Sequence, residues 1–191
     1  MKWWRSMELL EAFKKTGALL EGHFILRSGL RSRQYFQCAL LLQHAKLASE
    51  ICGLLAQKLQ DYSYDALISP AMGGILVGQE VARHLEGRHI FAEKLEGKLA
   101  IRRFEIKPGE RFLVLEDVIT TGSAVQETLR LVRAAGGIPV AVGTIVDRSG
   151  ECPPDFGVPM HSLLKLKVET FSPDALPDDL KSIPPVKPGS K

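Results

Sequence analysis

The fold of this chain is decided by the stretch Leu113-Val114-Leu115-Glu116-Asp117-Val118-Ile119-Thr120-Thr121-Gly122-Ser123-Ala124. An apolar strand leads into two adjacent carboxylates, then into a loop of small and hydroxyl-bearing residues, and then into a helical segment. Residues 111–115 are almost continuously apolar, as expected for a strand that is covered on both faces in a parallel sheet. The stretch therefore predicts a strand, a loop and a helix of an α/β fold.

The loop from Thr120 to Ala124 has the composition of an anion-binding site. Its small residues let backbone N–H groups converge on an anion at a helix N-terminus, where the helix dipole favours negative charge. A phosphate is the natural occupant. Glu116 and Asp117 could accept hydrogen bonds from vicinal ribose hydroxyls, but they would repel a phosphate in direct contact. A phosphorylated sugar lying between the loop and the acidic pair satisfies both requirements.

A plainer interpretation of the same residues is an ordinary helix start. In it, Thr120 or Thr121 is the N-cap residue, and the acidic pair is simply solvated at the end of a strand. Two adjacent acids after a strand this apolar argue against it, because carboxylates at a buried strand end are costly without a partner. We therefore favour phosphoribosyl binding.

The 191 residues, 45% of them hydrophobic, are enough for one domain. Strands expected near residues 66–68, 89–94 and 140–146 alternate with helices over 45–60, 73–87 and 123–135, which is typical of a parallel sheet. Residues 99–104 are expected to form an antiparallel excursion. We divide the single domain 1–191 into three parts: a helix and irregular hairpin (1–44), an α/β core (45–169) and a tail (170–191). The tail holds five of the 11 prolines, so little regular structure is expected there.

Charge and cysteine usage exclude several function classes. The net charge of +3, from 25 basic and 22 acidic residues, is too small to indicate nucleic-acid binding. No apolar run approaches the roughly 20 residues that span a bilayer, and no leader follows Met1, so we expect a cytoplasmic protein. Three cysteines without C-x-x-C spacing indicate neither a disulfide framework nor a zinc site, and the histidines show no metal-ligand spacing.

The central stretch resembles the phosphoribosyl-diphosphate motif of the type I phosphoribosyltransferases. Flanking segments narrow the resemblance to the orotate phosphoribosyltransferase family and extend it over nearly the whole chain. The supporting stretches are Gly22-His23-Phe24, Ser28-Gly29, Tyr35-Phe36, Ser69-Pro70-Ala71-Met72-Gly73-Gly74, Glu93-Lys94, Gly97-Lys98, Arg102-Arg103, Asp147-Arg148-Ser149-Gly150 and Phe156-Gly157-Val158-Pro159.

The resemblance implies a five-stranded parallel sheet flanked by helices, a small N-terminal hood and a mobile loop at about residues 94–107. It implies the Mg²⁺-dependent reaction of orotate with 5-phosphoribosyl 1-diphosphate, giving orotidine 5′-phosphate and diphosphate. It also implies a homodimer in which a loop of one subunit closes on the site of the other. Mg²⁺ is expected to be held mainly through substrate, so no protein ligand cage is expected.

The resemblance also implies roles for individual residues. The residues implied for catalysis are Lys94 and Asp117. Those implied for phosphoribosyl diphosphate binding are Lys94, Lys98, Glu116, Asp117, Val118, Ile119, Thr120, Thr121, Gly122, Ser123 and Ala124. Those implied for orotate binding are Thr120, Arg148, Arg27, Tyr35 and Phe36. Arg148 could pair bidentately with the orotate carboxylate, because a guanidinium matches its geometry.

Some positions depart from the family pattern. Arg27 replaces a lysine, Glu93 replaces an arginine, and Met72-Gly73 replace a Tyr-Lys pair, so backbone N–H groups of residues 71–74 must contribute more to diphosphate binding. No histidine follows in the loop before Arg111.

Several assignments keep a plainer alternative. Arg27 could be a solvated charge, Arg148 could be a surface partner of Asp147, and Tyr35-Phe36 could be packing residues of the hood. Lys98, Arg102 and Arg103 could form a solvated hairpin face.

Two rival functions stay open. A purine phosphoribosyltransferase would share the phosphoribosyl motif, although the hood stretch and Arg148 argue against it. A nucleotide-sensing regulator that binds nucleic acid would keep the fold, although the intact acidic pair and the small net charge argue against it.

Overall fold

The computed structural model describes residues 6–26, 29–151 and 153–188. The chain divides into two compact units. An α/β unit spans Leu42–Leu166, and a terminal unit combines Met1–Leu41 with Lys167–Lys191.

The α/β unit is built on a six-stranded sheet in the order β5-β4-β3-β6-β7-β8. Its strands are β3 (Ala66–Pro70), β4 (Arg88–Leu95), β5 (Lys98–Ala100), β6 (Arg111–Ile119), β7 (Ile138–Asp147) and β8 (Met160–Lys165). Five strands are parallel, and β5 is antiparallel to β4. The predicted five-stranded parallel sheet is therefore confirmed, and the antiparallel excursion extends it by one short strand.

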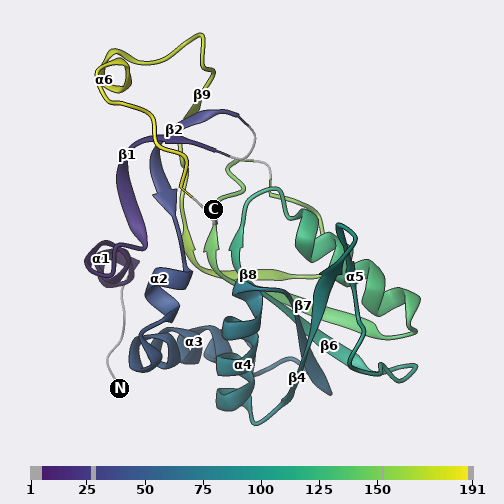
Figure 1. Ribbon diagram of the computed structural model, residues 1–191. Helices are drawn as coiled ribbons and strands as arrows, with labels where there is room; N and C mark the ends of the chain where they lie inside the picture. The colour runs from purple at the N-terminus through teal and green to yellow at the C-terminus, as the bar shows by residue number, and fades with distance from the viewer. Residues whose placement is uncertain (1–5, 27–28, 152, 189–191) are drawn as a thin grey trace. The chain divides into compact units, whose positions relative to one another are not determined.

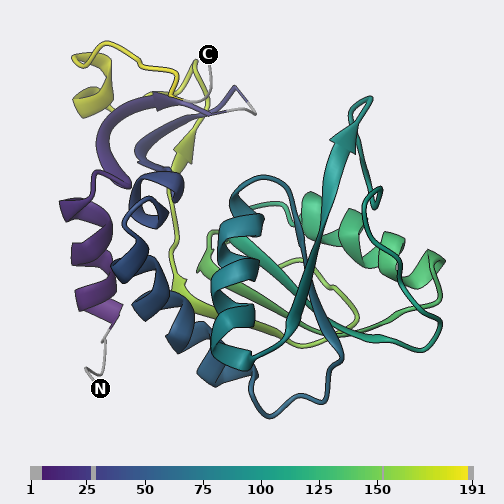
Figure 2. The same cartoon turned by 60° about the horizontal axis from the view of Figure 1, so that its bottom comes forward.

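Helices cover both faces of this sheet. The helices are α3 (Ala45–Leu59), α4 (Gly73–Leu85) and α5 (Ser123–Ala134). Figures 1 and 2 show α3 and α4 on one face and α5 on the other. The side chains of β6 alternate between these layers. Phe112 and Val114 join a cluster with Val125 and Leu129 of α5, and all four are buried.

Strand β6 is longer than the apolar run that predicted it. Pairing with β7 continues as far as Ile119, which stands opposite Asp147. The sequence placed Glu116 and Asp117 at the carboxyl end of the strand, and they lie within its last four residues. Hydrogen bonds to β7 extend β6 past the point where its apolar residues stop, and no local pattern in the sequence reveals this pairing.

The terminal unit contains a small antiparallel sheet in the order β1-β2-β9. Its elements are α1 (Ser6–Lys15), β1 (Leu19–Ile25), β2 (Arg31–Phe36), β9 (Thr170–Phe171) and α6 (Asp178–Lys181), and the short helix α2 (Ala39–Leu42) follows β2 at the unit boundary. The expected irregular hairpin is confirmed, with a register shift between Glu21 and Phe24. Within the proline-rich segment, Val186 forms a bridge to Phe24. No helix among the described residues is long and apolar enough to cross a membrane.

Candidate active site

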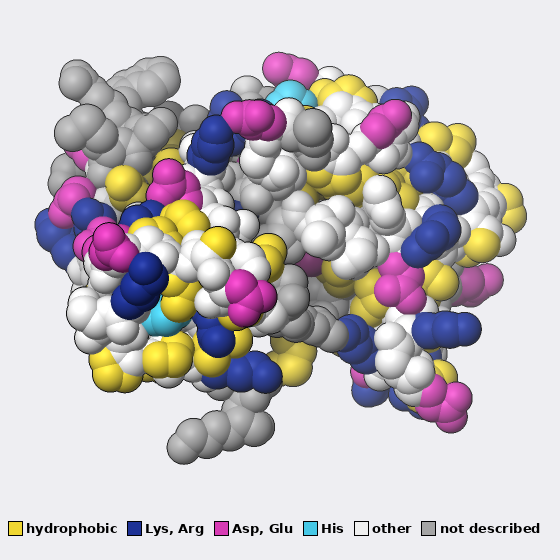
Figure 3. Space-filling model, turned by 90° about the horizontal axis from the view of Figure 1, so that it is seen from above, with side chains coloured by type: hydrophobic (Ala, Val, Ile, Leu, Met, Phe, Trp, Pro, Cys, Tyr) yellow, Lys and Arg dark blue, Asp and Glu magenta, His cyan; other side chains and the backbone are white. Residues whose placement is uncertain are grey.

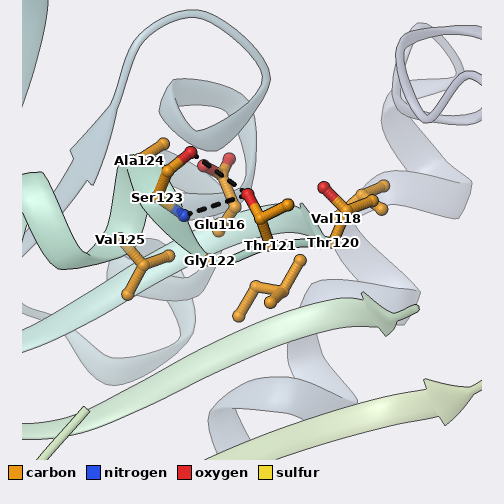
Figure 4. Close-up of a pocket in the computed structure, with 9 residues that line it drawn as sticks. Glu116, Val118, Thr120, Thr121, Gly122, Ser123, Ala124 and Val125 are labelled. Carbon is orange, nitrogen blue, oxygen red and sulfur yellow. Dashed lines mark hydrogen bonds between the residues drawn. The ribbon is translucent and has the colours of Figure 1, made fainter. Parts of the chain in front are cut away.

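The loop between β6 and α5 forms a small open pocket of about 60 Å³. Figure 4 shows this pocket, to which eight predicted residues contribute together with Val125, which was not predicted. The predicted residues are Glu116, Val118, Ile119, Thr120, Thr121, Gly122, Ser123 and Ala124. Asp117, the other predicted residue of the motif, does not line this pocket.

Gly122 determines the shape of the loop. It is the N-cap residue of α5 and adopts a left-handed conformation with φ of 73°, which favours glycine. A Cβ atom there would also lie 2.7 Å from the Pro154 side chain. The N-cap position carries no side-chain hydrogen bond, so the interpretation of Thr120 or Thr121 as N-cap residue is wrong. Thr121 instead contacts Ser123: its hydroxyl accepts a weak hydrogen bond from the Ser123 amide at 3.4 Å and donates to the Ser123 hydroxyl at 3.3 Å (Figure 4).

The two carboxylates lie at the same end of β6 but in different surroundings. Glu116 is 9% exposed, and its Oε1 accepts a hydrogen bond from the Asp117 amide at 3.0 Å. Burial, together with the neighbouring Asp117 carboxylate, raises the pKa of Glu116 well above its ordinary value. Asp117 is half-buried and accepts a hydrogen bond from the Val118 amide at 2.8 Å.

Two glycines at the start of α4 make room for these carboxylates. A Cβ atom on Gly73 would lie 2.3 Å from Asp117 Oδ2, and one on Gly74 would lie 3.1 Å from Glu116 Oε1. The first turn of α4 therefore lies close to both acids. Sequence reasoning expected Gly73 to open a helix and noted the loss of a lysine there, but it missed this role.

A hydrogen-bonded pair that joins β3 to β4 was also missed. Ser69, fully buried near the end of β3, shares a 2.8 Å hydrogen bond with His89 Nε2 on β4. Burial lowers the pKa of His89 to about 4, so its ring is neutral at physiological pH. A Cβ atom on Gly78 would lie 2.1 Å from the His89 ring. A glycine within a helical segment was the one available sequence signal for this close approach.

The predicted basic residues Lys94 and Lys98 lie on the β4–β5 hairpin. Figure 3 shows that Lys and Arg side chains gather on this projecting hairpin, at the lower right. Both lysines are exposed, and neither lines the pocket at Glu116. Arg103 pairs with Glu93 at 3.0 Å, and Arg102 approaches the same carboxylate at 4.0 Å.

The return segment after β5 packs against the α/β unit. The Leu99 amide donates to Glu127 of α5 at 2.8 Å, and the rings of Phe91 and Phe104 meet edge to face at 5.0 Å. Ile106 is buried in the core cluster beneath α5. Within the predicted loop, exposed basic side chains are therefore combined with apolar anchors at residues 104 and 106.

The described residues that are implied for orotate binding belong to both units of the chain. Arg148 follows β7, and its amide donates to the Ile119 carbonyl at 2.7 Å, which places it one residue from Thr120 across the sheet edge. In the terminal unit, Tyr35 is half-buried against Phe24, whereas Phe36 is buried in edge contact with Phe13. That burial favours the packing interpretation for Phe36. Arg27 lies outside the described residues.

The chain is similar to known proteins over most of its length. Residues 39–163 match the model of the phosphoribosyl transferase domain family. Orotate phosphoribosyltransferase from Desulforamulus reducens is 47% identical over 186 residues, which is 96% of each chain. The same enzyme from Caldicellulosiruptor bescii is 49% identical over 183 residues, covering 95% of this chain and 96% of its own.

A solved structure agrees with these relatives. The crystal structure of orotate phosphoribosyltransferase from Aeropyrum pernix matches with a TM-score of 0.71 and 29% identity, over 83% of this chain and 94% of that one. The similarity covers the acidic pair, the loop and the sheet on which they stand, not only a local motif. The chain therefore belongs to the phosphoribosyltransferase family and, within it, to the orotate phosphoribosyltransferases.

Proposed function

We propose that this protein transfers the phosphoribosyl group of 5-phosphoribosyl 1-diphosphate to orotate, forming orotidine 5′-phosphate and diphosphate. The observation that carries the proposal is the acidic pair of β6, seated against Gly73 and Gly74 beside an uncapped helix start. The named relatives, at 47% and 49% identity over nearly the whole chain, support the choice of orotate as the accepting base.

In this proposal the loop at the start of α5 binds the 5′-phosphate. Amide groups from Thr121 to Ala124 and the hydroxyls of Thr121 and Ser123 supply donors, and the α5 dipole favours the negative charge. The ribose hydroxyls then donate to Glu116 and Asp117. Hydrogen bonding to the sugar stabilises the ionised form of Glu116, which burial disfavours in the free protein.

The reaction requires no protein nucleophile. Breaking the C1–O bond leaves positive charge shared with the ring oxygen, so the transition state resembles an oxocarbenium ion. The protein then contributes orientation, exclusion of water and electrostatic stabilisation of the departing diphosphate. Lys94 and Lys98 are the exposed cations that we assign to the diphosphate. Asp117 is the carboxylate that we assign to the ribose, near its reacting C1 carbon.

The residues present fit a requirement for Mg²⁺. The described residues contain no group of three His, Cys, Asp or Glu side chains that could hold a metal, whereas the acidic pair offers hard oxygen donors next to the sugar. Mg²⁺ bound mainly by substrate oxygens, with Glu116 or Asp117 contacting it directly or through water, would supply neutralisation of the leaving diphosphate.

We assign the orotate carboxylate to Arg148 and a further orotate contact to Thr120. The hydrogen bond from the Arg148 amide to the Ile119 carbonyl holds these two residues at one sheet edge. Arg27 and Tyr35 stay proposed orotate contacts, and Phe36 supports the hairpin that carries Tyr35. We also propose that the active unit is a homodimer in which the β4–β5 hairpin of one subunit serves the site of the other.

One assay tests the proposed reaction. The purified protein is mixed with orotate, 5-phosphoribosyl 1-diphosphate and Mg²⁺, and the loss of orotate absorbance is followed together with diphosphate release. We expect stoichiometric consumption of both substrates, and none when Mg²⁺ is chelated. Consumption of adenine or hypoxanthine but not orotate would support a purine enzyme. No turnover of any base, with salt-sensitive nucleic-acid binding, would support a regulator.

A further inference from the structure

Asp147 is a buried carboxylate to which the proposed reaction assigns no role. It is the last residue of β7 and is 1% exposed. In the sheet it pairs with Ile119 of β6 on one side and with Lys165 of β8 on the other. Asp147 therefore stands at the carboxyl edge of three parallel strands, where ligands bind in open α/β sheets.

One oxygen of Asp147 shapes the turn that presents Arg148. Asp147 Oδ1 accepts hydrogen bonds from the Ser149 amide at 2.9 Å and from the Ser149 hydroxyl at 2.5 Å. This side-chain-to-backbone contact two residues ahead is an Asx turn. Because the Arg148 amide is held by Ile119, the backbone on both sides of the Arg148 side chain is fixed.

The other oxygen of Asp147 lacks a hydrogen bond. Asp147 Oδ2 is buried and finds no hydrogen-bond partner among the residues that the structure describes. The Lys165 ammonium lies 4.0 Å away, which is beyond hydrogen-bond distance, and its side chain is largely exposed. An unsatisfied acceptor on a buried charged group is costly, so Oδ2 at this edge calls for a donor that moves into place when substrate binds.

We propose that Asp147 is a positioning residue for orotate recognition: Oδ1 fixes the turn, and Oδ2 accepts a hydrogen bond from the Arg148 guanidinium when Arg148 pairs with the orotate carboxylate. The inference rests on the proposed function. A guanidinium has five N–H donors in a planar fork, so it can bind a substrate carboxylate and a protein carboxylate together. With Lys165, the cluster has two cations and one carboxylate, which leaves one positive charge for orotate.

The Asp147→Asn variant separates the two roles. Asparagine keeps an oxygen that can accept from Ser149 but has no second acceptor and no charge. We expect the KM for orotate to rise roughly tenfold to hundredfold, since hydrogen bonds to charged groups have that effect, and the KM for 5-phosphoribosyl 1-diphosphate to stay within about twofold. Uracil is orotate without its carboxylate. Its inhibition constant as a competitor of orotate should not change, because Asp147 acts through the carboxylate contact.

Two controls complete the test. Ser149→Ala removes one donor to Oδ1 but keeps the amide, and the KM for orotate should then stay within about twofold of wild type. A crystal structure of the wild-type protein with orotidine 5′-phosphate should place a guanidinium nitrogen of Arg148 about 2.7–2.9 Å from Asp147 Oδ2. This measurement applies even if the Asp147→Asn variant does not fold.

Three results would overturn the inference: an unchanged KM for orotate in Asp147→Asn, an equal loss of orotate and uracil binding, or an Arg148 guanidinium far from Oδ2 in the complex. Failure of the wild-type protein to consume orotate would instead contradict the proposed function, so the two failures are distinguishable.

Discussion

The backbone of Gly73 lies directly against the carboxylate of Asp117. A Cβ atom at position 73 would be 2.3 Å from Asp117 Oδ2 and 2.6 Å from its Cγ, closer than any side chain tolerates. Gly73 opens α4, so the carboxylate sits beside the positive end of a 13-residue helix. The absence of a side chain at position 73 is thus part of how the Asp117 carboxylate is positioned.

The first prediction is that Gly73→Ala lowers activity without lowering stability. The added methyl group displaces the end of the flexible Asp117 side chain rather than the backbone, and alanine is at least as favourable as glycine in a helix. We expect kcat/KM for 5-phosphoribosyl 1-diphosphate to fall at least about tenfold, because small displacements of positioned groups cost that much. Steady-state kinetics and thermal melting measure the two effects.

Gly78→Ala is the matched control in the same helix. Its methyl group would lie 2.1 Å from the His89 ring inside the protein, so it should lower Tm, unlike Gly73→Ala. Full activity of Gly73→Ala would show that Asp117 does not depend on the space that Gly73 leaves beside it.

The second prediction concerns the stability cost of Glu116. Burial and the Asp117 carboxylate raise the pKa of Glu116, so the folded state holds its proton at a pH where the unfolded chain has lost it. The free energy of unfolding therefore decreases as pH rises above the ordinary glutamate pKa. Glu116→Gln should be more stable than wild type at pH 8, the gain should vanish near pH 4, and kcat/KM for 5-phosphoribosyl 1-diphosphate should fall about tenfold or more.

Urea unfolding of both proteins at pH 8 and pH 4 measures this difference. Glu105→Gln, a change at an exposed carboxyl of the hairpin return, serves as the control and should show no pH-dependent gain. Equal stability of Glu116→Gln and wild type at both pH values would mean that Glu116 ionises in the folded protein without cost.

The third prediction follows from the depressed pKa of His89. Its folded-state pKa of about 4 lies below the ordinary value, so below about pH 6.5 the unfolded chain binds a proton that the folded protein excludes. The free energy of unfolding contributed by this site is complete above pH 6.5 and should decrease by about 2 to 3 kcal/mol as pH falls to 4. His89→Gln should lack this part of the pH dependence. Parallel stability curves for variant and wild type would show that His89 titrates normally.

Local sequence was enough to predict the strand, loop and helix of the motif, because these elements and the two acids are consecutive from residue 111 to 134. It also predicted the parallel sheet, since apolar runs alternate with helical segments. The two glycines that make room for the acids could not be predicted this way. Gly73 and Gly74 are more than 40 residues from the carboxylates, and only the pairing of β3 beside β6 brings α4 to that edge.

The contribution of the chain ends was equally hidden from local patterns. Composition predicted a proline-rich tail with little regular structure, but it could not show that Val186 pairs with Phe24. Tyr35 and Phe36 formed one aromatic pair in the sequence, yet a strand directs alternate residues to opposite faces, and only Phe36 is buried. A pairwise assignment to orotate therefore has to be divided between a candidate contact and a packing residue.

The last prediction tests whether Lys94 acts across a dimer interface. Lys94 is exposed on the projecting β4–β5 hairpin and does not line the pocket of its own chain, which is consistent with service to a neighbouring site. The test mixes Lys94→Ala subunits with Asp117→Asn subunits, each inactive alone. If Lys94 acts in trans, one site of every mixed dimer combines an intact Asp117 with an intact Lys94, while the other site carries both changes.

Mixing should then restore activity toward about a quarter of wild type, because random exchange makes about half of the dimers mixed and each has one competent site. If Lys94 acts within its own chain, every site keeps one change and mixing restores nothing. Subunit exchange has to be verified separately, for example by native mass spectrometry of differently tagged chains. Exchange without recovered activity would contradict the shared site but leave the assigned reaction intact, because a lysine acting in cis can neutralise the same diphosphate.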